Sequence, residues 1–226
     1  MSLARVARFI SNLSGAQTDL EYNMPLSEPK ARSPLHTRTI TIDAFFREDG
    51  LTDIEATLVD TKPVQFRLGV DRPYVAAGEA IHRISVRLSV DASGTIHETE
   101  VAMDASPYHC CKEVEMKFQL NGVQLGAGFL KAVRERIGTE GNCWHASQLL
   151  PQMATVLVQA NYLAMRERID RLPSDQRPAP AMLNSCVGWQ DHRVHVQKDF
   201  PKFYREKRSP DQKDRPRTGP EDELPT

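Results

Sequence analysis

The side chains best suited to chemistry are thiols and imidazoles in the second half of the chain. Cys143 and His145 lie two residues apart at the start of a long apolar stretch. Cys110 and Cys186 belong to separate segments on either side of them. Three thiols and one imidazole form a suitable tetrahedral ligand set for zinc or iron. We therefore expect a metal or iron–sulfur site made by Cys110, Cys143, His145 and Cys186.

A second interpretation makes Cys143 a catalytic thiol. A thiol at the N-terminus of a helix lies in the positive field of the helix dipole, which favours the thiolate, and His145 is then its acid–base partner. Asp53 and Glu55 are two apart on a predicted strand, so both face the same side and could orient a small-molecule substrate. No C-x-x-C pair is present. Buried structural cysteines in a non-catalytic binding module therefore remain a third interpretation.

Several further polar residues lie where predicted elements begin or end. His36 and His82 each precede a predicted strand, and adjacent strand ends would bring the two imidazoles together. The remaining candidates are His109, Cys111, the acidic residues Asp49 and Asp60 with Lys62, and residues 104–108. A solvated outer face of a sheet explains the acidic residues equally well. A helix cap explains Asp104 or Ser106.

The apolar stretch at residues 141–171 must position Cys143 and His145. Its apolar residues recur at steps of three and four, which predicts a helix with one broad buried face. Asn142 is a candidate cap. Pro151 removes one helical hydrogen bond, so we expect a kink there or a division into a short and a long helix.

Two hairpins precede the helices. Apolar residues alternate from Ile40 to Phe46 and from Ile84 to Val90, and each run is followed by a turn and a returning strand. Residues 63–80, with two prolines and two glycines, read as a long loop. Helices are expected near residues 110–120 and at 126–138, where Gly138 ends the second. This order predicts an α+β fold: an antiparallel sheet of about four strands followed by a helical layer packed on one face.

The ends of the chain differ from this core. Residues 1–34 read as a flexible arm, residues 35–205 as a single α+β domain, and residues 206–226 as a charged, proline-rich, disordered tail. Within the domain, residues 172–180 form a linker. Residues 181–204 carry enough apolar side chains to dock back, with a short hairpin expected around residues 190–192.

Composition narrows the functional classes. The chain has 226 residues, 40% hydrophobic and 26% charged, with a formal charge of −1. These values are typical of a soluble globular protein, and they argue against a nucleic-acid or membrane partner. We see no secretory signal pattern, and four cysteines with two adjacent do not resemble a disulfide framework. We expect reduced thiols and a cytoplasmic location.

Distinctive segments resemble a bacterial family known as domain of unknown function 2889. They are LHTRTITI at 35–42, REDGLTDIEATLVDTKP at 47–63, AAGEAIHRISVRLSVD at 76–91, DASPYHCC at 104–111, GAGFLKAVRERIG at 126–138, GNCWHASQLLPQMATVLVQA at 141–160 and LNSCVGW at 183–189. The resemblance covers roughly residues 34–205. It implies the extent of the domain and a bacterial source, and it brings no established activity.

Overall fold

The computed structural model describes residues 26–126, 128–138 and 142–207. The chain divides into two units, residues 1–35 and residues 36–226, and the second contains the strands and helices described below. Residues 1–25 of the predicted arm and residues 208–226 of the predicted tail lie outside the described residues. Among the described helices, none is both long and apolar enough to cross a membrane.

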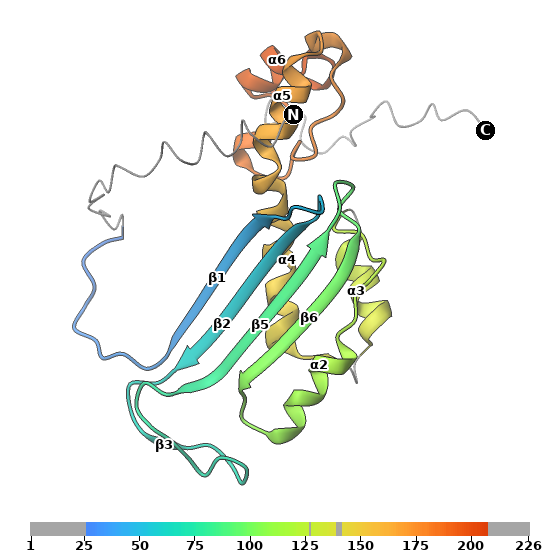
Figure 1. Cartoon of the computed structure of the whole chain (residues 1–226). Helices are drawn as coiled ribbons and strands as arrows, with labels where there is room; N and C mark the ends of the chain where they lie inside the picture. The colour runs from blue at the N-terminus through green and yellow to red at the C-terminus, as the bar shows by residue number, and fades with distance from the viewer. Residues whose placement is uncertain (1–25, 127, 139–141, 208–226) are drawn as a thin grey trace. The chain divides into compact units, whose positions relative to one another are not determined.

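A four-stranded antiparallel sheet forms the centre of the second unit (Figure 1). Its strands are β1 (Thr37–Phe46), β2 (Thr52–Thr61), β5 (Ala80–Val90) and β6 (Ile96–Ala105), in the order β1-β2-β5-β6. The turns of the two hairpins contain Gly50 and Gly94, with φ of 91° and 86°, a conformation that favours glycine. The predicted α+β class and sheet of about four strands are confirmed.

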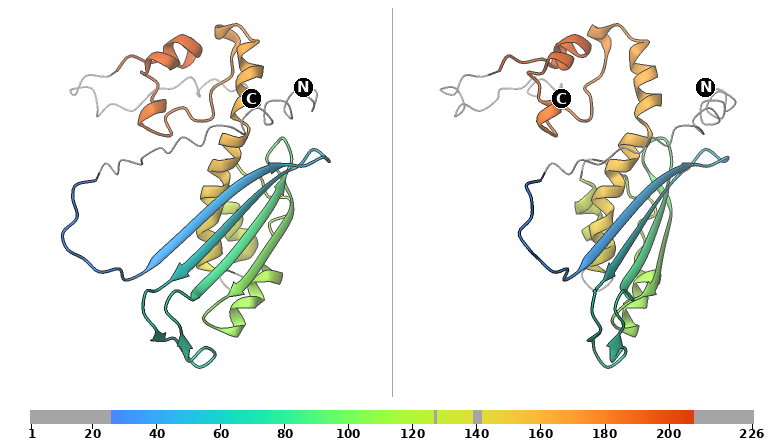
Figure 2. Two further views of the ribbon diagram at one scale, coloured as in Figure 1. Left: turned by 60° about the vertical axis from the view of Figure 1, so that its left-hand side comes forward. Right: turned by 90° about the vertical axis from the view of Figure 1, so that its left-hand side faces the viewer.

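Apolar and polar side chains alternate along the central strands, so the sheet has one buried face and one solvent-exposed face. Ile54, Ala56 and Leu58 of β2 are at most 1% exposed, as are Ile84, Val86 and Leu88 of β5. The helices cover this inner face (Figure 2), and α4 contacts β1, β2 and β5. Residues of opposite phase, such as Glu55 and Arg87, point to the uncovered outer face.

The connections are more structured than predicted. The expected loop at residues 63–80 contains a small two-stranded sheet, β3 (Phe66–Arg67) paired with β4 (Tyr74–Val75). The helix expected near residues 110–120 is a 3-10 helix, η1 (His109–Glu113), followed by one turn of α-helix, α2 (Val114–Lys117). The predicted second helix is confirmed as α3 (Phe129–Ile137), and Gly138 ends it with a φ of 65°.

Of the two outcomes predicted for Pro151, a kink or a division of the long helix, the division does not occur. α4 (Trp144–Ala160) runs through Pro151 as one helix, and the break falls at Asn161, before α5 (Tyr162–Asp170). Pro151 lies on the exposed side of α4, whereas Leu149, Leu150 and Met153 are fully buried beneath it. Packing of that apolar face holds the helix together across the missing hydrogen bond, because tertiary contacts contribute most helical stability in proteins.

The C-terminal segment docks, but without the expected hairpin. Residues 174–203 form η2 (Ser174–Gln176), η3 (Val187–Trp189), α6 (Val194–Asp199) and η4 (Pro201–Phe203). Val196 and Phe200 pack with Ile169 of α5 in a small separate core. An ion pair from Arg166 Nη1 to Asp199 Oδ2, at 2.9 Å, joins the same two helices. The segment therefore packs on α5.

Candidate functional site

A row of three charged or polar residues crosses the inner face of the sheet at one end. Arg38 of β1 is directly opposite Asp60 of β2, and Asp60 is directly opposite His82 of β5. Each continues the inward phase of its strand, since Ile40, Leu58 and Ile84 form the next row. The sheet thus places a polar row where a purely apolar face would otherwise continue.

Asp60 is the hub of this row and is 1% exposed. Its Oδ1 accepts hydrogen bonds from Arg38 Nε at 2.8 Å and from His36 Nε2 at 3.1 Å. Its Oδ2 accepts from Arg38 Nη2 at 2.8 Å and from His82 Nδ1 at 3.0 Å. Both carboxylate oxygens are therefore fully engaged, which is what burial of a charge requires.

The first turns of α4 pack over this row on the inner face of the sheet. The rings of His145 and His82 lie face to face at a tilt of 33°, with centroids 3.9 Å apart. Gln148, one turn further along α4, accepts a hydrogen bond from Arg38 Nη1 at 2.9 Å. We call Asp60, His82 and His145, with Arg38 and His36 around them, the Asp60 centre.

The environment sets the charge of each group in the Asp60 centre. Burial tends to raise the pKa of Asp60, but the hydrogen bonds and charge of Arg38, with the bonds from His36 and His82, outweigh it and lower that pKa to about 2. Burial lowers the pKa of His82 against the opposing effect of Asp60. Burial, and then the neighbouring His82 and Arg38, lower the pKa of His145. Near neutral pH, Asp60 is therefore ionised, and the neutral imidazole is favoured at His82 and at His145.

This donor set is compact enough to be a candidate metal site. Ligand atoms of Asp60, His82 and His145 all lie within 4.8 Å of one another, and no other such group of three occurs among the described histidines, cysteines and acidic residues. Two donors each about 2.1 Å from a zinc ion are separated by roughly 3.0–3.4 Å. The hydrogen bond between His82 Nδ1 and Asp60 Oδ2, at 3.0 Å, has a length in that range, and an ion bound by both atoms would replace its proton.

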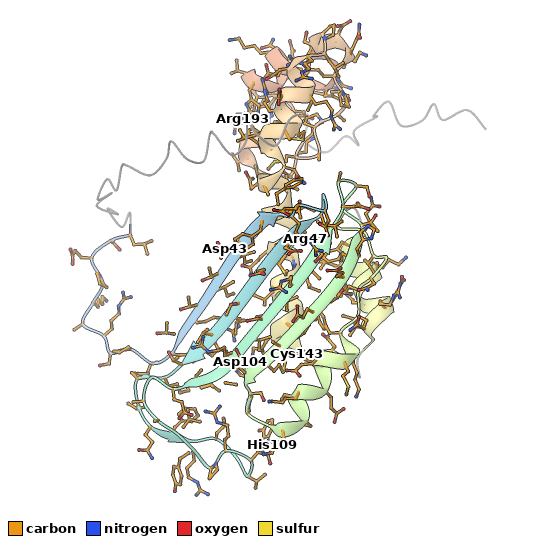
Figure 3. All side chains as sticks on the ribbon, in the orientation of Figure 1. Asp43, Arg47, Asp104, His109, Cys143 and Arg193 are labelled. Atoms are coloured by element: carbon orange, nitrogen blue, oxygen red, sulfur yellow. The ribbon has the colours of Figure 1, made fainter. Side chains whose placement is uncertain are left out.

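The structure places the predicted thiols in two separate regions. Cys143 is the N-cap residue of α4, and Cys110, Cys111 and Cys143 line one small pocket of about 160 Å³ between η1 and the start of α4 (Figure 3 labels Cys143). Burial raises the pKa of Cys111. Cys186 is exposed in the C-terminal segment, before η3.

The four predicted ligands therefore do not meet as a set. Among the described residues, no three of Cys110, Cys143, His145 and Cys186 have ligand atoms within 4.8 Å of one another. Cys143 precedes the first helical residue in an extended conformation (φ −108°, ψ 119°), whereas His145 lies in the first turn of α4. Cys143 faces the η1 pocket, and His145 faces His82 on the sheet.

Asp53 and Glu55 lie on the same side of β2, as expected, but that side is the outer face. Glu55 accepts from Arg87 Nε at 2.7 Å, and Arg87 also donates to Glu100. Asp53 accepts from Ser89 Oγ at 2.6 Å and from Arg47 (labelled in Figure 3). Because β2 alternates, these carboxylates point away from α4, so the sheet separates them from Cys143 and His145.

The Asp60 centre combines residues that the sequence places in different candidate groups. His36 and His82 are predicted to come together at adjacent strand ends, and both contact Asp60. Asp60 itself is predicted with the acidic residues and His145 with the thiols, whereas Arg38 and Gln148 belong to no predicted site. A usable signal was present, because Arg38, Asp60 and His82 are each in phase with an alternating apolar run. The segment at residues 104–108 forms no such cluster; its Tyr108 is the N-cap residue of η1 and 47% exposed.

Comparison with known proteins identifies a family and no activity. Residues 36–159 match the family model described as protein of unknown function (DUF2889). No curated protein and no solved structure matches the chain. The matched region includes Arg38, Asp60, His82 and His145 and covers more than half of the 226 residues. The chain therefore belongs to the DUF2889 family of proteins of unknown function.

Proposed function

We propose that this protein binds a transition-metal dication, zinc or iron, at the Asp60 centre. The observation that carries the proposal is the convergence of His82 and His145 on the buried Asp60, with donor atoms of all three within 4.8 Å of one another. Mixed nitrogen and oxygen donors suit zinc and ferrous iron, and three protein ligands leave coordination positions for water or a substrate.

The protonation states favour metal binding near neutral pH. A metal ion needs neutral imidazoles and an ionised carboxylate. The lowered pKa values of His82, His145 and Asp60 provide this set without the loss of protons. The charge states therefore suit an ion, although His82 Nδ1 would have to give up its hydrogen bond to Asp60 Oδ2 before that nitrogen could bind one.

Arg38 weakens the site while it stabilises the empty protein. Its guanidinium occupies both oxygens of Asp60 and places a positive charge beside the position of the ion. Asp60 must exchange part of this pairing for the metal. We therefore expect moderate affinity, and we expect Arg38 to be the residue that sets it.

Cobalt(II) titration of the metal-free protein tests this proposal. Cobalt bound by His82, His145 and Asp60 should give weak visible bands without the intense near-ultraviolet absorption of a cobalt–thiolate bond. His145→Ala and His82→Ala should abolish these bands, and Cys143→Ser should leave them unchanged. Thiolate absorption that is lost in Cys143→Ser would instead support the ligand set Cys110, Cys143, His145 and Cys186. No binding at all would exclude both sites.

A reactive thiol at Cys143 is the second candidate, supported by its N-cap position and its two neighbouring thiols, Cys110 and Cys111. In this alternative His145 does not act on Cys143 directly, because it contacts His82. Asp53 and Glu55 take no part, since they lie on the outer face. The test is the rate of alkylation by iodoacetamide. Fast reaction of Cys143 near neutral pH, compared with exposed Cys186 as the internal reference, supports it, and equal rates contradict it.

We also propose a cytoplasmic location in a bacterial cell; the four free cysteines support the location, and the resemblance of the sequence segments implies the bacterial source. The net charge of −1 supports a partner other than nucleic acid. Fractionation of cells that express the tagged full chain tests the location. Recovery in an oxidising compartment would contradict it.

A further inference from the structure

A second cavity, of about 330 Å³, lies between α3 and the first half of α4, on the side of α4 that faces away from the sheet. Its apolar lining is made by Leu130, Val133 and Ile137 of α3 with Trp144 and Pro151 of α4. Trp144 is 69% exposed and Leu130 42% exposed. The volume is at the lower end of the range for small-molecule sites.

The polar part of the described lining carries a positive charge. Among the described residues that line this cavity, Arg134 is the only charged one, and Asn142, Ser147 and Gln148 add neutral polar groups. No acidic side chain in the described part of the chain forms an ion pair with Arg134. An apolar hollow in whose described lining a guanidinium is the single charged group is complementary to a molecule that has an apolar body and one anionic group.

We infer that this cavity binds a small organic anion, a carboxylate or sulfonate with an apolar body. The anionic group pairs with Arg134, and the body packs on Trp144, Leu130 and Pro151. Gln148 belongs to both sites, because it lines the cavity and also accepts the hydrogen bond from Arg38, which holds Asp60. The cavity forms without a metal. Anion binding in the cavity and metal binding at the Asp60 centre can therefore be tested independently.

A matched pair of fluorescent probes tests the inference on the full chain without added metal. 8-Anilinonaphthalene-1-sulfonate is anionic, and N-phenyl-1-naphthylamine has a closely similar apolar body without charge. We expect the anionic probe to bind at least about tenfold more tightly than the neutral one. Arg134→Gln should remove this difference by weakening the anionic probe alone. Trp144→Ala should weaken both probes.

Arg136→Gln is the matched control, since Arg136 is exposed on the last turn of the same helix but does not line the cavity. Equal weakening by Arg136→Gln and Arg134→Gln would show general charge attraction and overturn the inference. Equal affinity for the two probes in the native chain would overturn it as well. Circular dichroism of each variant confirms that probe binding reports the folded protein.

Discussion

Each face of the sheet carries a row of polar side chains in which an arginine pairs with a carboxylate, but the two rows lie in opposite environments. On the inner face, Arg38, Asp60 and His82 lie on three adjacent strands beneath α4. On the outer face, Glu55, Arg87 and Glu100 lie on three adjacent strands in contact with solvent. The side chain of Asp60 is 2% exposed, whereas that of Glu55 is 41% exposed.

This difference separates an ordinary surface from a site. Exposed ion pairs contribute little stability, typically below about 1 kcal/mol, and sheets commonly carry them on a wet face. A buried carboxylate is expensive unless every lone pair is engaged, and an apolar residue in phase with Leu58 would fill the same space without that expense. The inner row is therefore a candidate for function, and the outer row is explained by solubility and strand pairing.

Replacement of the hub should have the largest effect. Asp60→Asn removes the charge that pairs with Arg38 and should lower the free energy of unfolding by about 3 kcal/mol, near the lower limit for a broken buried ion pair because Arg38 is one-third exposed. Urea denaturation measures the change. If the free energy of unfolding falls by less than about 1 kcal/mol, Asp60 contributes no more to stability than the exposed carboxylates of the outer face.

Replacement of Arg38 should separate stability from metal affinity. Arg38→Met frees both oxygens of Asp60 and removes a positive charge beside the ion. Zinc affinity should rise about tenfold even though the metal-free protein becomes less stable. Isothermal titration calorimetry with zinc measures the affinity, and Arg87→Met on the outer face is the control. Weaker zinc binding in Arg38→Met would contradict the assignment of Arg38 as a competitor of the metal.

Acid should lower the stability of the protein through the histidines at the inner face of the sheet. The pKa values of folded His82 and His145 lie below the ordinary value of 6.5, so the unfolded chain takes up protons first as the pH falls. The contribution of the two neutral histidines to the free energy of unfolding should therefore be fully present above about pH 6.5. It should decrease as the pH falls below that value. Denaturation of the native chain and of His82→Gln/His145→Gln, over about pH 7.5 to 5, measures this effect. If the free energy of unfolding falls equally steeply with pH in both proteins, groups other than His82 and His145 cause the loss of stability.

The smallest effect is expected on the outer face. Glu55→Gln breaks the pair with Arg87, which keeps Glu100 as a partner. Unfolding free energy should change by less than about 1 kcal/mol, and metal binding should not change. The same denaturation and zinc titration measure both quantities. A loss comparable to that of Asp60→Asn would remove the distinction between the two faces.

Local patterns in the sequence were sufficient for the fold class. Alternation in β1, β2 and β5 predicted the sheet, and Gly138 marked the end of α3. Predictions failed where packing decided the outcome: Pro151 is tolerated within α4 because its apolar face is buried, and the C-terminal segment docks on α5 as helical turns.

The candidate site was harder to predict because it depends on register and on a long-range contact. Nothing local shows that Arg38, Asp60 and His82 are opposite one another, since this follows from the pairing of strands 22 residues apart in sequence. Cys143 and His145 were predicted to act together because they are close in sequence, yet Cys143 caps α4 beside η1 and His145 in the first turn contacts His82. The inward phase of Asp60 after Leu58 was the one local sign of a buried charge.

The most direct test of the metal centre is a crystal structure of zinc-soaked protein, with anomalous diffraction measured on both sides of the zinc absorption edge. The account predicts one strong anomalous peak within coordination distance of ring nitrogens of both His82 and His145, and its loss in His145→Ala. A peak at Cys110 and Cys143, or no peak at the Asp60 centre at saturating zinc, would contradict it.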